Sequence, residues 1–148
     1  MKRIFIVNII CSLYILLFIY AASSKLMDYQ QFKTQLGSSP LLTKYAGAVS
    51  IAIPALEIGL SLMLVSKRWK LLSLYLSLGL MVAFASYIIV VTHYSYYVPC
   101  SCGGVLQHMT WNQHLIFNFL FIGLAITAIL LHTNGPRPAT GEAENLYI

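Results

Sequence analysis

Charged residues are scarce in this sequence. Only 9% of its 148 residues are charged, whereas 59% are hydrophobic. Soluble domains carry about 25% charged residues, so this composition excludes an ordinary water-exposed surface. The formal net charge of +5 comes from nine basic and four acidic residues, and in a membrane protein basic residues mainly report topology. We therefore expect a membrane protein whose partner is the lipid bilayer, and no nucleic-acid partner.

The sequence also lacks the alternating apolar and polar residues of a membrane β-strand. It has instead four continuous apolar segments, each near the roughly 20 residues with which a helix crosses a bilayer. They cover residues 4–24, 46–65, 71–92 and 113–132. Because helices satisfy their own backbone polar groups in lipid, we predict an all-α fold, an integral membrane four-helix bundle over residues 1–133. The polar Pro/Gly-rich tail, residues 134–148, is expected to be flexible and cytoplasmic.

The first apolar segment has a second interpretation. Lys2 and Arg3, the apolar run and Ala21-Ala22-Ser23 together are similar to a secretory signal. The run is about 19 residues long, however, whereas the core of a signal has about 7–15. We therefore favour a retained membrane helix.

The distribution of basic residues predicts the orientation of the bundle. One side would carry Lys2, Arg3, Lys67, Arg68, Lys70 and Arg137, and the other Lys25, Lys33 and Lys44. Basic residues favour the cytoplasmic side, so we expect both termini in the cytoplasm, in a multi-pass protein of the bacterial inner membrane. In the first outer loop, Tyr29, Phe32 and Leu36 recur at helical spacing before Gly37, which predicts a short interfacial helix.

Cysteine is rare, with three residues in the chain. Cys100 and Cys102 lie in the only long polar break of the second half, on the side predicted to face the periplasm, where disulfides form and persist. A C-x-C disulfide closes a very small ring, and strained disulfides are readily reduced. We interpret the pair as a reactive dithiol, with unreactive thiols or a static link as the alternative. Cys11, about 20 Å below the outer surface, is interpreted as a small buried residue.

The cysteine pair does not have the C-x₂₋₄-C spacing that is typical of structural zinc sites. Thiolate, thioether and imidazole groups together would suit copper(I) or zinc. Those near the pair in sequence are His93, His108, Met109 and His114. We expect no metal site, and a copper-binding carrier remains an alternative.

Glu57 is the one acidic residue within an apolar segment. A carboxylate near the middle of a bilayer is costly and usually faces the bundle interior. Ser50, Pro54 and Ser61 share its helical face. We consider two roles for Glu57, a proton or quinone contact and an interhelical hydrogen bond. The partners considered for that hydrogen bond are Asn8, Ser12 and Asn118.

Three groups of residues resemble the MauE/DoxX-like membrane proteins. They are residues 21–26 with Asp28, residues 54–57 with Gly59, and residues 100–104 with 111–114 and Asn118. The resemblance covers almost all of the chain except the tail. It implies a four-helix, redox-associated protein that helps form or handle periplasmic disulfides, often beside a thioredoxin-like partner. In that family, MauE is associated with maturation of methylamine dehydrogenase, whose small subunit is rich in disulfides.

The residues and the resemblance together predict thiol–disulfide exchange. One of Cys100 and Cys102 attacks a disulfide, or is attacked, and the other resolves the mixed disulfide. The predicted supporting residues are Glu57, Lys25, Trp111, His114 and Asn118. Lys25 or His114 would stabilise a thiolate if the loops converge. Electrons would leave to a periplasmic thioredoxin-like or client protein, or to a membrane quinone. The alternative is a non-catalytic accessory subunit of a larger membrane complex.

Overall fold

The computed structural model describes residues 2–38, 42–94 and 110–134, and every regular element among them is helical. In chain order the elements are α1 Lys2–Met27, α2 Tyr29–Ser38, a 3₁₀ turn Thr43–Tyr45, α3 Ala46–Val65, α4 Lys70–Tyr94 and α5 Trp111–Thr133. The helices α1, α3, α4 and α5 are long and apolar enough to cross a membrane, with mean hydropathies of 2.1 to 2.5. The predicted all-α fold with four membrane-spanning helices is therefore confirmed.

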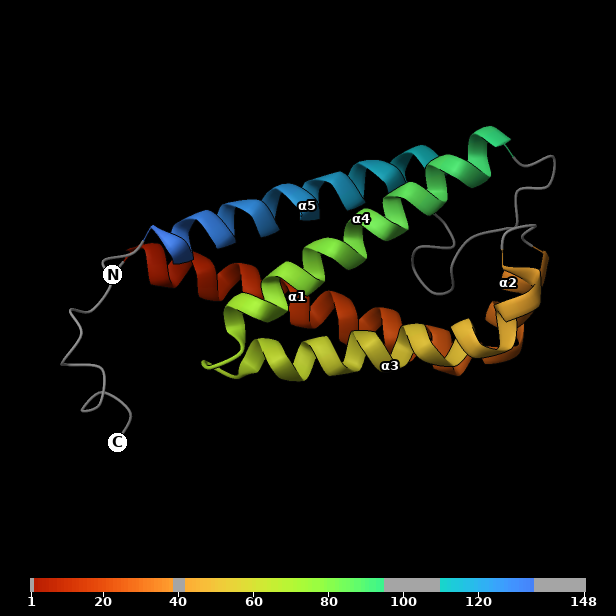
Figure 1. Cartoon of the computed structure of the whole chain (residues 1–148), viewed down its shortest axis with the longest axis horizontal. Helices are drawn as coiled ribbons and strands as arrows, with labels where there is room; N and C mark the ends of the chain where they lie inside the picture. Colours follow the sequence, from red (N-terminus) through yellow and green to blue (C-terminus); the bar gives the residue numbers. More distant parts are fainter. Residues whose placement is uncertain (1, 39–41, 95–109, 135–148) are drawn as a thin grey trace.

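The four long helices form a bundle whose two ends differ (Figure 1). Helix α1 packs along α3, and α4 packs along α5. The start of α1, the α3–α4 turn and the end of α5 share one end of the bundle, where the Arg3 guanidinium donates to the Asn134 carbonyl oxygen at 3.2 Å. At the same end, Lys70 Nζ donates to Asn8 Oδ1 at 2.8 Å. Helix α2 and the start of α5 lie at the opposite end.

Helix α2 follows α1 almost without interruption and lies across the end of the bundle (Figure 1). Backbone hydrogen bonds continue through the turn, from Asp28 N to the Ser24 carbonyl oxygen and from Phe32 N to the Asp28 carbonyl oxygen. Phe32 and Leu36 are buried and pack with Ala46 of α3. The short helix expected in this loop is thus present, and its location at the membrane interface stays a prediction.

The main core lies between the four long helices, and α3 contributes Leu60 and Leu64 to it. Tyr14 is fully buried, and its hydroxyl donates to the Phe121 carbonyl oxygen at 2.6 Å while the two rings meet edge to face. Ala125 and Ala128 have no exposed surface, and such small side chains allow neighbouring helices to approach closely. Cys11 is buried in the same cluster.

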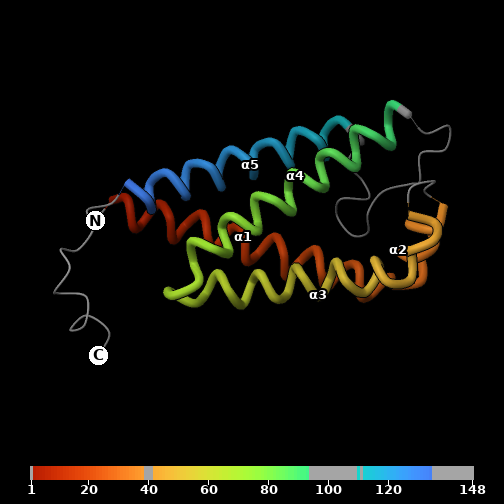
Figure 2. The backbone as a smooth tube through the Cα atoms, in the orientation of Figure 1, coloured from red at the N-terminus to blue at the C-terminus, as the bar shows by residue number. Residues whose placement is uncertain are grey.

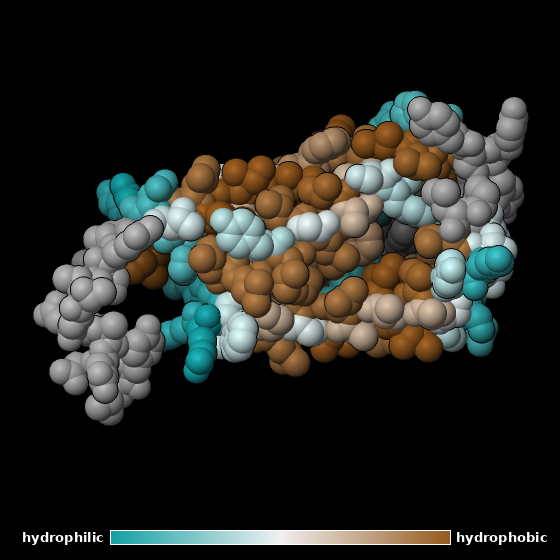
Figure 3. All heavy atoms as spheres, viewed as in Figure 1, coloured by the Kyte–Doolittle hydropathy of each residue, from teal (hydrophilic) through white to brown (hydrophobic). Residues whose placement is uncertain are grey.

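The face of the bundle shown in Figure 3 is predominantly apolar. Large side chains of every long helix are exposed, among them Leu16, Leu62, Leu76 and Ile116. Contiguous apolar surface of this extent is unusual for a water-soluble monomer, whereas lipid tails solvate it without cost. The surface therefore agrees with the lengths of the helices in indicating a bilayer environment.

Candidate functional site

Lys25 and Glu57 form a buried ion pair inside the bundle. The Lys25 ammonium donates to Glu57 Oε1 at 2.6 Å, and the two side chains are 9% and 1% exposed. The aromatic rings of Phe32 and Phe84 lie 5.9 and 5.6 Å from the same ammonium group, within the range of a cation–π contact. Four elements, α1, α2, α3 and α4, therefore surround one charge.

The backbone geometry explains how these two residues meet. Helices α1 and α3 run in opposite directions (Figure 2), and side chains on a helix lean toward its N-terminus. The Lys25 side chain near the end of α1 therefore leans into the bundle. The Glu57 side chain leans along α3 toward the end from which Lys25 comes. The long aliphatic part of the Lys25 side chain then spans the distance along the bundle between the Lys25 backbone and the Glu57 carboxylate.

A cavity of about 290 Å³ lies next to the ion pair. Side chains from all five α-helices line it, and most of them are aliphatic or aromatic, such as Phe18, Ile53 and Met81. Helices α3 and α4 diverge from the turn that joins them (Figure 2), and a hollow separates them toward the α2 end (Figure 3). This hollow is called the side opening below.

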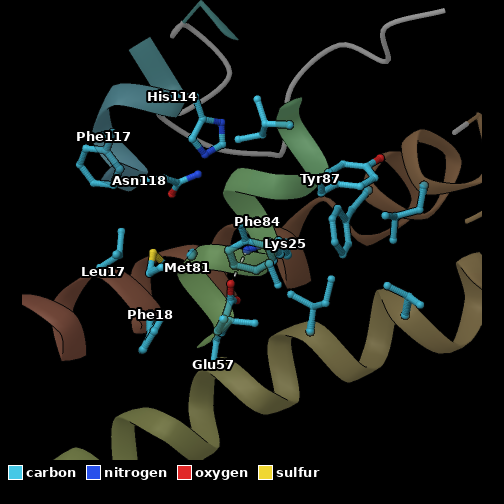
Figure 4. Close-up of a pocket in the computed structure, with 18 of the residues that line it drawn as sticks. Leu17, Phe18, Lys25, Glu57, Met81, Phe84, Tyr87, His114, Phe117 and Asn118 are labelled. Atoms are coloured by element: carbon cyan, nitrogen blue, oxygen red, sulfur yellow. Dashed lines mark hydrogen bonds and ion pairs between the residues drawn. The ribbon is translucent and has the colours of Figure 1, made fainter. Parts of the chain in front are cut away.

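Helix α5 contributes polar groups to the same cavity. His114 and Asn118 project from α5 on the side opposite Glu57 (Figure 4). Asn118 is 2% exposed, and its Nδ2 atom has no hydrogen-bond partner within the described residues. Glu57 Oε2 is likewise buried without a partner there. Because such groups cost free energy when left unpaired, they mark positions where a ligand or water is expected.

The start of α5 is fixed by a capping box. Thr110 Oγ1 accepts from the Gln113 backbone N–H at 3.4 Å, and the Gln113 side-chain oxygen accepts from the Thr110 backbone N–H at 3.0 Å. These bonds satisfy two donors that a helix start otherwise leaves free. They also set the first turn of α5, from which His114 reaches the cavity.

Four of the predicted supporting residues meet in this cavity: Lys25, Glu57, His114 and Asn118. Trp111 is the first residue of α5, and its side chain lies outside what the structure describes. The predicted catalytic pair, Cys100 and Cys102, also lies outside the described residues, as do His108 and Met109.

The partner of Glu57 differs from the three residues considered from sequence. Asn8 Oδ1 accepts from Lys70, and the Ser12 hydroxyl donates to the Asn8 carbonyl oxygen of its own helix. Lys25, which the charge pattern placed in an outer loop, is instead buried against Glu57. The polar face of α3 does point inward as predicted, because Ser50, Pro54, Glu57 and Ser61 are all buried.

The described residues contain no cluster of three or more His, Cys, Asp or Glu side chains with the arrangement of a metal site. His93 in particular uses Nδ1 within its own helix, at 3.1 Å from the Ile89 carbonyl oxygen.

The four long apolar helices define a multi-pass helical membrane protein. The family model described as methylamine utilisation protein MauE matches residues 3–131, so the chain belongs to the MauE family, membrane proteins associated with methylamine utilisation. Neither the curated proteins nor the solved structures give a significant match.

Proposed function

We propose that this protein is a thiol–disulfide redox protein of the bacterial inner membrane that assists disulfide formation in periplasmic proteins. The reacting groups are Cys100 and Cys102, and both termini face the cytoplasm. The observation that carries the proposal is the C-x-C sequence in a chain of the MauE family. The segment that holds it connects α4 to α5, and α5 begins at the end of the bundle opposite the start of α1.

The exchange transfers two electrons from a client protein to the cysteine pair. A client thiolate attacks the Cys100–Cys102 disulfide, one sulfur of the pair leaves as a thiolate, and a mixed disulfide forms. The second client thiolate then attacks the client sulfur of that bond. The client becomes a disulfide, and Cys100 and Cys102 become two thiols. A two-electron acceptor, such as a thioredoxin-like protein or a membrane quinone, must reoxidise them.

Trapping of the mixed disulfide in membranes tests the proposal. Membranes that contain Cys100→Ser or Cys102→Ser are acid-quenched and alkylated, and adducts are resolved under non-reducing conditions. One single variant should accumulate an adduct that a reductant releases: its remaining thiolate can attack a client disulfide in the reverse direction, and the second cysteine that would resolve the mixed disulfide is missing. Cys11→Ser is the matched control, since Cys11 is buried in α1, and it should behave as the wild type.

The double variant Cys100→Ser/Cys102→Ser separates this proposal from the alternatives. Client disulfides should form more slowly in cells that carry it. Unchanged client disulfides, together with unchanged co-purification of a membrane complex, would instead favour an accessory subunit. A stoichiometric metal that purifies with the wild type and is lost from the double variant would favour a carrier.

A further inference from the structure

We propose that the cavity beside Lys25 and Glu57 binds the head group of a membrane quinone, which enters between α3 and α4. The proposal depends on four features of the described residues: the apolar walls, the side opening, the absence of net charge in the ion pair, and the unpaired buried polar atoms. The redox role given to the bound quinone rests on the proposed function above, whereas the binding site does not.

The walls and the opening restrict the ligand to molecules that dissolve in lipid. The cavity lies among four helices that are long and apolar enough to span a membrane, and α3 and α4 separate beside it (Figure 3). Its volume of about 290 Å³ is at the small end of ligand pockets, which span roughly 300–1,000 Å³. That volume suits one substituted ring, with a hydrocarbon tail left in the opening.

The electrostatics favour a neutral head group. Lys25 and Glu57 carry opposite charges 2.6 Å apart, so the pair offers little net attraction to an anion or a cation. A carboxylate or phosphate head would also face Glu57 Oε2, which is already buried and unpaired. Since a like charge without a partner is costly in a dry site, a fatty acid or an anionic lipid fits less well.

The polar atoms match a group that accepts hydrogen bonds in one redox state and donates them in the other. Asn118 Nδ2 is a buried donor without a partner, and it lies across the cavity from Glu57 Oε2, a buried acceptor without one (Figure 4). Quinone carbonyl oxygens accept from such a donor, and the hydroxyls of a hydroquinone donate to such an acceptor. The imidazole of His114 can act in either sense.

The position of the cavity connects it with the cysteine segment. His114 lies one turn into α5, so it is one turn away from where that segment rejoins the bundle at Thr110. The reaction balances as two cysteine thiols plus quinone giving one disulfide plus hydroquinone. Two electrons and two protons pass from the thiols to the quinone. The site would therefore supply the acceptor that reoxidises Cys100 and Cys102.

A binding experiment with matched variants tests the site. The full chain is purified and placed in lipid nanodiscs, and a benzoquinone with a decyl tail is titrated while tryptophan fluorescence is followed. Decanoate and decylbenzene are titrated in parallel as an anionic and a purely apolar ligand of the same tail. Saturable binding of the quinone, weaker binding of both comparison ligands, and crosslinking of an azido-quinone to peptides of the cavity are expected.

Asn118→Leu and Asn112→Leu make the same change on the same helix, one in the cavity and one on the exposed surface. Loss of one hydrogen bond should weaken quinone binding by about 3- to 10-fold in Asn118→Leu and leave Asn112→Leu unchanged. Asn118→Leu should keep or raise the melting temperature, because it removes an unpaired buried group. Loss of binding can then be separated from misfolding.

Three outcomes would overturn the quinone site: no saturable binding, decanoate binding at least as tightly as the quinone, or equal weakening in the two leucine variants. The double variant Cys100→Ser/Cys102→Ser distinguishes the two proposals. It should bind quinone as the wild type does but fail to form hydroquinone when a dithiol client is added. Quinone binding with wild-type rates of hydroquinone formation in this variant would refute the cysteine role and leave the quinone site standing.

Discussion

Lys25 and Glu57 should behave as a coupled unit: removal of one partner should be costly, whereas replacement of both should cost little. At a separation of 2.6 Å, two unit charges attract by about 6 kcal/mol at an effective dielectric constant of about 20. Desolvation of both groups offsets much of that attraction. Removal of one partner, however, leaves the other buried alone, which costs about 3–5 kcal/mol.

A double-mutant cycle measures this coupling. Lys25→Met should lower the free energy of unfolding by about 3–5 kcal/mol, because it leaves the Glu57 carboxylate, which is buried deep in the bundle. Glu57→Leu should cost less, because the freed lysine lies near a helix end and can extend toward water. The double variant Lys25→Met/Glu57→Leu should be more stable than Lys25→Met alone, since apolar residues can replace a buried pair with little loss.

Reversible unfolding in mixed detergent micelles provides the measurement. Lys44→Met is the matched control, because Lys44 is exposed, and it should change stability by less than about 0.5 kcal/mol. We expect a coupling energy of at least about 2 kcal/mol between the two sites. If the two single effects instead add within about 0.5 kcal/mol, the pair is not a coupled unit and the argument fails.

Two further changes test the packing that positions the cavity. Tyr14→Phe should lower the free energy of unfolding by about 1 kcal/mol, because it removes the 2.6 Å hydrogen bond to the Phe121 carbonyl oxygen. Thermal unfolding measures this loss of stability. An equal loss in the half-exposed control Tyr75→Phe would contradict a stabilising role for the Tyr14 hydrogen bond. Thr110→Ala should cost about 0.5–2 kcal/mol and speed hydrogen exchange in the first turn of α5, and unchanged exchange there would argue against the capping box.

The helices were predictable because each depends on a local property. An apolar run of about 20 residues has few alternatives in lipid, so the sequence alone indicates four crossings. The apolar spacing of Tyr29, Phe32 and Leu36 indicated a short helix, which the structure places at Tyr29–Ser38. The run that predicted α1 ends before Lys25, whereas α1 continues to Met27. Apolar length could not show this, because Lys25 is accommodated by a residue of another helix.

The sequence identified the individual residues of the candidate site, but it did not predict which of them contact one another. The inward direction of Glu57 followed from the cost of a carboxylate in lipid. Its partner did not, because Lys25 is 32 positions away and meets it only through the antiparallel packing of α1 and α3. The signal present in the sequence was a lone acid in an apolar segment together with a cation at the end of a neighbouring one. His114 and Asn118 join the site through the rotation of α5, which no local pattern encodes.

The cavity makes structural sense only if something occupies it. Closed cavities cost about 24 cal/mol per Å³, so 290 Å³ sets an upper limit of about 7 kcal/mol for an empty space of this size. Each unpaired buried polar atom adds about 1–3 kcal/mol, and Glu57 Oε2 and Asn118 Nδ2 are two of them. Leucine at Asn118, and apolar residues at Lys25 and Glu57 together, would remove these costs without leaving a buried charge unpaired. A cavity that remains hollow and polar although apolar residues would make the protein more stable is expected where a protein binds a ligand. The ion pair then keeps the polar end of the cavity in the same position as the ligand binds and leaves.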